Sequence, residues 1–337
     1  MKPCNEKFLR SCFVIATMML VCALPLFHGN ANASMAEVKS VSSTEDFCLL
    51  ILGEDEASGL CDVVMLASVR NGGESVGLMQ IPRDTYLKYT EKNYKKINGA
   101  VATLGGAQAL CRLLESTLAL EIDGYVKVDL SFVKRAVDVL GGVEIDVPCD
   151  MDYDDPAQGL SIHLKKGRQR LTGEQAAQFI RFRSGYKRAD LTRIDAQKLF
   201  LAALLNAAKK VDGKDIPRLA STVMMSAETD VSIATIISWL RLAPSLDMGG
   251  VTFVTAPGEE VKSEYSGAWY YVLSRSGVAE VLETQFGVFG ASAAIDPAHL
   301  FSDVRRPVFE EVYRRHISPE YYSADMLSQE GIAADKR

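Results

Sequence analysis

The chain reads Val63-Val-Met-Leu-Ala-Ser-Val69, then Arg70-Asn-Gly-Gly73, then Val76-Gly-Leu-Met-Gln-Ile81, and this stretch decides the fold. Both apolar runs are rich in β-forming residues, and the glycines between them supply the positive φ angles of a tight turn. We therefore predict an antiparallel hairpin. Residues 47–52 form an earlier apolar run that ends at a glycine, and this run predicts a first buried strand.

Helix-like and strand-like patterns alternate after the hairpin. Apolar residues at helical spacing occupy 110–118, an alternating pattern returns at 125–128, and a helix is expected at 131–140 before a strand at 143–147. Such alternation predicts an α/β layered domain. We further expect an acidic, solvated loop at 149–159, a helix opened by the capping box Thr172-Gly-Glu-Gln175, a helix from Asp190 to about 209, helices at 233–242 and 277–286, and a strand at 251–255.

The amino terminus has the pattern of an export signal. Lys2, Lys7 and Arg10 precede an apolar run at 12–27, and Ala31-Asn-Ala33 offers a cleavage site. The run leaves open a cleaved signal peptide or an uncleaved anchor over 1–34, and either one places the rest of the chain outside the cytoplasm. A polar linker at 35–46, a domain at 47–286 and a variable tail at 287–337 complete the expected organisation.

Composition limits the classes of function. The 337 residues are 48% hydrophobic, which is enough for a substantial core, and 43 acidic against 37 basic residues give a net charge of -6. That balance excludes a general basic surface for nucleic acid. Cys48, Cys61, Cys111 and Cys149 match no zinc spacing, and their pattern leaves disulfides and buried thiols as alternatives.

Four arginines are candidates for an anion site: Arg83, Arg181, Arg183 and Arg193. The guanidinium fork pairs with two phosphate oxygens at once, so several arginines in one cleft would suit a diphosphate, although a single arginine more often only solvates a surface.

Carboxylates supply the other candidate groups. Asp55 and Asp62 flank a short loop and are candidate ligands of magnesium, or else they cap a turn and begin a strand. Asp190 could deprotonate a hydroxyl or could cap a helix. The acidic cluster at 150–155 lacks the glycine and glutamate offsets of a calcium loop, and Gly73-Glu-Ser-Val-Gly77 lacks the strand–helix context of a serine nucleophile.

The order and the residues of these motifs resemble those of the LytR-CpsA-Psr family of cell-envelope phosphotransferases. The similarity covers residues 47 to about 285 and rests on several blocks, which are Ile51-Leu-Gly-Glu-Asp55, Asp62 to Val69, Ile81-Pro-Arg-Asp-Thr85, Lys96-Ile-Asn98, Tyr125-Val-Lys-Val128, Leu140-Gly-Gly-Val143, Arg181-Phe-Arg183, Asp190 to Gln197, and Ala256-Pro-Gly-Glu259 with Trp269.

The resemblance implies an α-β-α sandwich with a mixed central sheet and a hydrophobic tunnel for a polyprenyl tail. It implies that Asp55 and Asp62 hold Mg²⁺ on a lipid diphosphate, that Arg83, Arg181, Arg183, Arg193 and Gln197 bind the diphosphate, and that Arg83, Asp190 and Arg193 act in catalysis. The implied reaction transfers a glycopolymer, such as teichoic acid, from a polyprenyl diphosphate to peptidoglycan at the membrane surface.

This sequence departs from the family pattern at three points. The loop between Asp55 and Asp62 is short and lacks an arginine, Ala196 stands where the family commonly has another arginine, and the signal looks more cleavable than the usual anchor. Two other functions remain open: a pyrophosphatase that uses water as acceptor, and a non-catalytic lipid-binding transcriptional attenuator. Intact Asp55, Asp62 and Arg83 favour catalysis.

Overall fold

The structure is a computed structural model that describes residues 46–55, 58–90, 95–156, 159–182, 189–216, 225, 227–232, 236, 247–264, 266–300 and 307–329. The expected export signal and almost all of the expected linker lie outside these residues. No helix in the described ranges is both long enough and apolar enough to cross a membrane.

A mixed sheet forms the centre of the molecule. Its strands are β1 (Phe47–Asp55), β2 (Leu60–Arg70), β3 (Ser75–Ile81), β4 (Gly124–Val128), β9 (Ala227–Thr229), β10 (Val251–Thr255) and β13 (Tyr321–Ser323). These seven strands lie in the order β13-β10-β3-β2-β1-β4-β9. β1 is antiparallel to β2 and parallel to β4, so the sheet is mixed as the sequence predicts.

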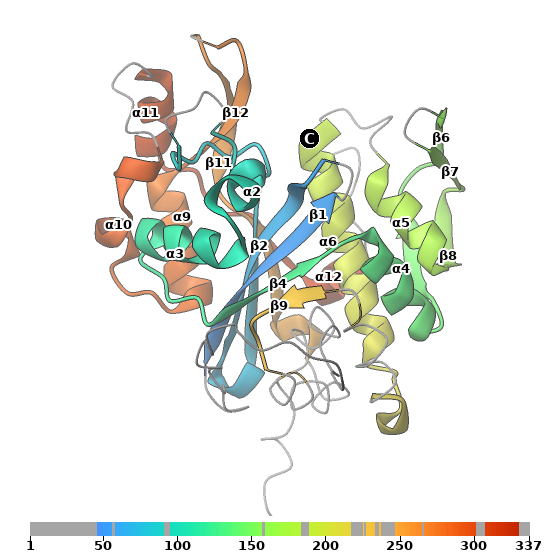
Figure 1. Cartoon of the computed structure of the whole chain (residues 1–337). Helices are drawn as coiled ribbons and strands as arrows, with labels where there is room; N and C mark the ends of the chain where they lie inside the picture. Colours follow the sequence, from blue (N-terminus) through green and yellow to red (C-terminus); the bar gives the residue numbers. More distant parts are fainter. Residues whose placement is uncertain are drawn as a thin grey trace, which may run out of the picture.

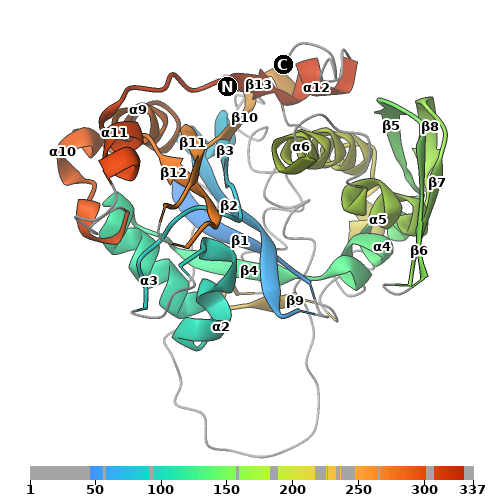
Figure 2. The same ribbon diagram turned by 90° about the horizontal axis from the view of Figure 1, so that it is seen from above.

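Helices cover both faces of this sheet (Figures 1 and 2). One face carries α4 (Leu130–Val139), α5 (Gly173–Arg181), α6 (Ala189–Ala208) and α12 (Ala324–Gln329). The other carries α2 (Ala100–Leu104), α3 (Ala107–Leu118), α9 (Arg275–Phe286), α10 (Ala291–Ala294) and α11 (Pro307–Arg314). The expected three-layer sandwich is therefore confirmed.

The β1 strand is buried on both faces because its alternating side chains enter two separate cores. Leu49 and Ile51 join the core beneath α4, α5 and α6, whereas Leu50 and Leu52 join the core beneath α3 and α9. A strand that is buried on both faces reads as an unbroken apolar run, which is the pattern seen at 47–52.

The β2–β3 hairpin is confirmed. Its turn contains Asn71, Gly72 and Gly73, with φ angles of 55°, 62° and 90°, so asparagine also adopts the left-handed region here. Gly77 on β3 has a packing role, because a Cβ atom there would lie 2.8 Å from the Cβ of Gln285. The sheet and α9 therefore approach more closely than a larger side chain allows.

Three two-stranded ribbons lie outside the central sheet: β5 (Val143–Val147) with β8 (Gly167–Leu171), β6 (Met151–Asp155) with β7 (Leu160–Leu164), and β11 (Gly258–Lys262) with β12 (Trp269–Leu273). The sequence predicted only β5 among these strands.

The expectation of a loop at 149–159 is wrong for residues 151–155, which form β6. Across the ribbon, Nδ1 of His163 lies 2.7 Å from Asp152 and Nε2 lies 3.3 Å from Asp154, while Met151 and Ile162 are buried beneath. These cross-strand contacts stabilise the ribbon, although its acidic residues made the segment look like a loop.

The helix predictions are confirmed where the structure describes them. Thr172 accepts from the backbone N–H of Gln175, whose side chain completes the capping box of α5. The expected helix at 233–242 lies outside the described residues, apart from Ile236. The segment beyond residue 287 packs against the central domain. Its strand β13 pairs with β10, and the Lys198 ammonium lies 5.1 Å from the centroid of the Tyr322 ring.

Candidate functional site

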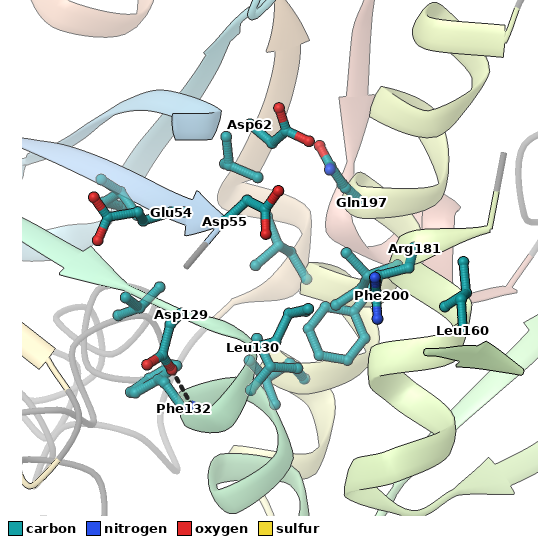
Figure 3. A pocket seen from close by; sticks show the side chains of 18 of the residues that line it. Glu54, Asp55, Asp62, Asp129, Leu130, Phe132, Leu160, Arg181, Gln197 and Phe200 are labelled. Atoms are coloured by element: carbon teal, nitrogen blue, oxygen red, sulfur yellow. Dashed lines mark hydrogen bonds between the residues drawn. The ribbon is translucent and has the colours of Figure 1, made fainter. Parts of the chain in front are cut away.

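A cavity of about 370 Å³ opens where β1 and β4 end, beneath α4, α5, α6 and the β6–β7 ribbon (Figure 3). Its charged and amide-bearing lining residues are Glu54, Asp55, Asp62, Asp129, Arg181 and Gln197. The larger, apolar part of the lining includes Ile51, Val128, Leu130, Phe132, Val133, Leu160, Ile180, Phe200, Leu201 and Leu204. The site is thus amphipathic, with charged groups and an apolar chamber in one space.

An irregularity in β2 places Asp62 in this cavity. Val63 pairs with Gly53, and Cys61 pairs with Glu54. Gly53 and Glu54 are adjacent in β1, whereas Asp62 separates Cys61 from Val63 in β2, so Asp62 is one extra residue in β2. Such a bulge reverses the alternation of side chains between the two faces of the sheet for the residues on one side of it. Cys61 consequently enters the core of the opposite face, while Asp62 and Val63 line the cavity together with Asp55.

Arg83 follows β3 and pairs with Asp62. Its Nη1 lies 3.1 Å from Oδ1 and 3.3 Å from Oδ2 of that carboxylate. Nε of Arg83 is 3.7 Å from Asp84, which in turn receives the Lys96 ammonium at 2.5 Å. The two side chains of the Arg83–Asp62 pair are 24% and 22% exposed, so the pair is accessible to a ligand while being partly shielded from water.

Gln197 reaches the cavity from α6, and its amide is held from the sheet side. Nε2 of Gln80 on β3 donates to Oε1 of Gln197 at 2.5 Å. Figure 3 shows Gln197 beside Asp62, with Asp55 nearby on the end of β1 and Arg181 approaching from the end of α5. The structure therefore gathers four predicted residues around one cavity, and Arg83 contacts one of them, Asp62.

The remaining predicted residues are only partly described. Asp190 and Arg193 have their backbone in the first two turns of α6, the helix that carries Gln197, but their side chains lie outside the described part, as does Arg183 altogether. Their predicted roles stay predictions.

Sequence reasoning missed two carboxylates of the cavity. Asp129 is the N-cap of α4 and accepts from the Phe132 backbone at 2.7 Å, a position that its place before a helix could have indicated. Glu54 pairs with Lys127 at 3.3 Å, and Glu228 meets the same ammonium at 2.8 Å. Burial alone would lower the pKa of Lys127, but the hydrogen bonds and charges of Glu228 and Glu54 raise it.

The carboxylate oxygens of the cavity suit a hard cation that takes its other ligands from water or phosphate. Asp55 and Asp62 offer carboxylate oxygens on one wall, and no group of three or more His, Cys, Asp or Glu side chains suited to a metal occurs among the described residues. Magnesium typically takes one or two carboxylates and fills its other positions with water and phosphate. Asp55 and Asp62 therefore match the carboxylates that such a site needs from the protein.

The four cysteines of the domain are free thiols, and Cys48, Cys61 and Cys111 are buried. Burial raises the pKa of Cys61 and of Cys111 to about 12. Of the two alternatives that the sequence left open, buried thiols are confirmed for these three, and Cys149 is a partly buried thiol.

Comparison with known proteins identifies the class. The sequence model of the LytR_cpsA_psr family matches residues 28–287, and the chain belongs to this family. Relatives include the polyisoprenyl-teichoic acid–peptidoglycan teichoic acid transferase TagV of Bacillus subtilis (strain 168), 26% identical over 269 residues that cover 77% of this chain and 68% of the relative. The transferase of the same kind named TagU from Oceanobacillus iheyensis is 27% identical over 249 residues, which cover 69% of this chain and 73% of that protein.

Solved structures agree with the fold. The crystal structure of B. subtilis TagV superposes with a TM-score of 0.61 at 26% identity, covering 72% of this chain and 97% of that one. The structure of TagT bound to LIIa-WTA superposes with a TM-score of 0.58 at 22% identity, covering 76% and 97% of the two chains, and at this identity it supports the fold alone.

Proposed function

We propose that this protein transfers a glycopolymer from a polyprenyl diphosphate carrier to peptidoglycan, outside the cytoplasmic membrane. One observation carries the proposal: a single cavity combines Asp55, Asp62, Arg181 and Gln197, backed by Arg83, with an extensive apolar lining. A polyprenyl diphosphate has the same two parts, a polyanionic head and an apolar tail. The names of the TagU and TagV relatives support the same donor and acceptor.

The diphosphate head would lie at the charged end. Arg83, Arg181 and the amide of Gln197 supply hydrogen-bond donors for its oxygens, and the predicted Arg183 and Arg193 would add to them. Magnesium held by Asp55 and Asp62 would neutralise the charge that develops on the phosphates. The apolar residues of α4 and α6 would receive the first units of the tail.

In the proposed reaction, a hydroxyl oxygen of the peptidoglycan sugar forms a bond to the phosphorus that carries the glycan. The bond from that phosphorus to the bridging oxygen breaks, and polyprenyl monophosphate leaves with the electron pair. The hydroxyl proton passes to a carboxylate, for which Asp190 is the candidate from its sequence position. The product is a phosphodiester between glycan and peptidoglycan.

The location follows from the substrates. The lipid donor remains in a membrane and the acceptor is part of the wall, so the enzyme must work at the outer surface of the cytoplasmic membrane. The amino-terminal apolar run supports export, whether it is cleaved or kept as an anchor.

Reconstitution tests this proposal. The detergent-solubilised full chain would be incubated with a polyprenyl diphosphate-linked glycan, Mg²⁺ and peptidoglycan oligomers, and the products separated by mass spectrometry. We expect a magnesium-dependent adduct of glycan and oligomer that is lost in Asp62→Ala. Tight lipid binding without any turnover would contradict the proposal and would instead indicate a carrier or regulator.

A further inference from the structure

Two buried glutamines join the sheet to α6 at the wall of the cavity. Gln80 is 1% exposed and Gln197 is 5% exposed. Gln80 lies in β3, in register with Met65 of β2 and Thr255 of β10, so its position is fixed by strands on both sides. Its side chain donates to Oε1 of Gln197 at 2.5 Å.

This hydrogen bond decides which end of the Gln197 amide faces the cavity. A glutamine amide has an acceptor end and a donor end with two protons. Because the acceptor end is held by Gln80, the Nε2 donor of Gln197 is the end that remains for the cavity that this residue lines. Phosphate oxygens only accept hydrogen bonds at neutral pH, so this orientation suits a phosphate and the reversed one would repel it.

The other end of Gln80 indicates that its amide is present for function. Its Oε1 is buried and has no hydrogen-bond partner in the described structure. An unsatisfied buried oxygen lowers the stability of the fold, so packing alone does not account for a glutamine at this position. Residues that break a packing rule in this way are expected at functional sites.

We propose that Gln80 is a positioning residue of the donor site, which holds Gln197 with its Nε2 donor toward the diphosphate. The inference rests on the proposed function, because it assumes that the cavity binds a prenyl diphosphate. Gln80 itself does not line the cavity and acts only through Gln197.

The test compares Gln80→Met, Gln197→Met and the double variant, since methionine keeps the length of the side chain and removes the amide. Binding of a C20 prenyl diphosphate and of the matching C20 prenyl alcohol to the detergent-solubilised full chain would be measured by calorimetry with Mg²⁺ present. We expect Gln80→Met to weaken diphosphate binding about tenfold, as for one hydrogen bond to a charged group, and to leave alcohol binding unchanged. The double variant should bind no more weakly than Gln197→Met, and thermal melting should show that Gln80→Met is folded.

Three results would overturn the inference: unchanged diphosphate affinity in Gln80→Met, equal losses for diphosphate and alcohol, or multiplied losses in the double variant. Gln80→Leu repeats the test if Gln80→Met melts early. A wild-type chain that binds the alcohol but not the diphosphate would contradict the proposed function itself, so the two failures can be told apart.

Discussion

Nη1 of Arg83 lies within 3.3 Å of both carboxylate oxygens of Asp62, although Asp62 lies in β2 and Arg83 follows β3. The bulge in β2 makes this contact possible, because it directs Asp62 to the cavity instead of the opposite core. The pair links a candidate ligand of magnesium to a candidate ligand of phosphate. A substrate that carries both the metal and the phosphates would meet the two charges together.

Replacing Arg83 is expected to abolish most transfer. In Arg83→Ala we expect the rate to fall by about 10²- to 10³-fold, the usual cost of removing one group that stabilises transition-state charge. Arg83→Lys should recover only part of the rate, since an ammonium cannot form the two-pronged contact. Arg70→Ala is the matched control: Arg70 lies at the far end of β2, bonded to the Thr284 carbonyl, and the variant should transfer normally. An active Arg83→Ala would remove this residue from the mechanism.

We expect Asp84 to affect the rate of transfer by holding the side chains of Arg83 and Lys96 in place. It lies 3.7 Å from Nε of Arg83 and receives Lys96 at 2.5 Å, so Asp84→Asn removes the charge that holds both cations. We expect a fall in kcat of about tenfold, corresponding to roughly 1.4 kcal/mol. Steady-state kinetics would check this, with Asp150→Asn as control, because Asp150 precedes β6 and forms an exposed ion pair with Lys165. Equal kinetics in the two variants would show that Arg83 keeps its position without Asp84.

The apolar chamber can be tested by filling it. Leu201 lines the cavity from α6, and Leu201→Trp adds volume where the prenyl tail is expected. Affinity for a C20 prenyl diphosphate should fall at least tenfold, whereas inorganic diphosphate should bind as before. Overpacking costs about 1–3 kcal/mol, so thermal melting must first show that the variant is folded. A parallel loss of both ligands would mean that the tail does not lie there.

Alkaline pH should destabilise the fold through its buried thiols. The pKa of Cys61 and of Cys111 is about 12 in the folded protein, against a usual 9.0, because burial disfavours the thiolate. The unfolded chain therefore releases these protons from pH 9 upward while the folded chain keeps them. Stability contributed by these groups is complete below pH 9 and is lost as the pH rises toward 12, by up to about 1.4 kcal/mol per pH unit for each thiol.

Urea unfolding at several pH values between 8 and 11 measures this slope. Cys61→Ala should flatten it, whatever its effect on stability at pH 8. A wild-type profile that stays level above pH 9 would show that the thiols ionise within the fold.

Sequence patterns predicted the elements that carry a strong local signal. Both strands of the β2–β3 hairpin, the capping box of α5 and the start of α6 near Asp190 were found because turn glycines, cap residues and apolar periodicity act over a few positions. The ribbon of β6 and β7 was missed because its pairing depends on His163 and the aspartates opposite, which are known only once the chain has folded.

The residues of the site were predicted from short sequence motifs, but their arrangement was not. Motif residues such as Asp55, Asp62 and Gln197 could be named from the family resemblance, and the structure brings them to one cavity. The bulge that turns Asp62 inward and the Gln80–Gln197 bond could not be named, since each depends on the register between strands or on the distance between sheet and helix.

The measurement that tests the central claim most directly follows the oxygen atoms. The full chain, donor, Mg²⁺ and peptidoglycan oligomers would react in water enriched in ¹⁸O, and the phosphorus-containing products would be weighed by mass spectrometry. Transfer to a sugar hydroxyl predicts a phosphodiester and a polyprenyl monophosphate that both lack ¹⁸O. A glycan phosphate that carries one ¹⁸O, without the phosphodiester, would show that water enters, and it would contradict the account.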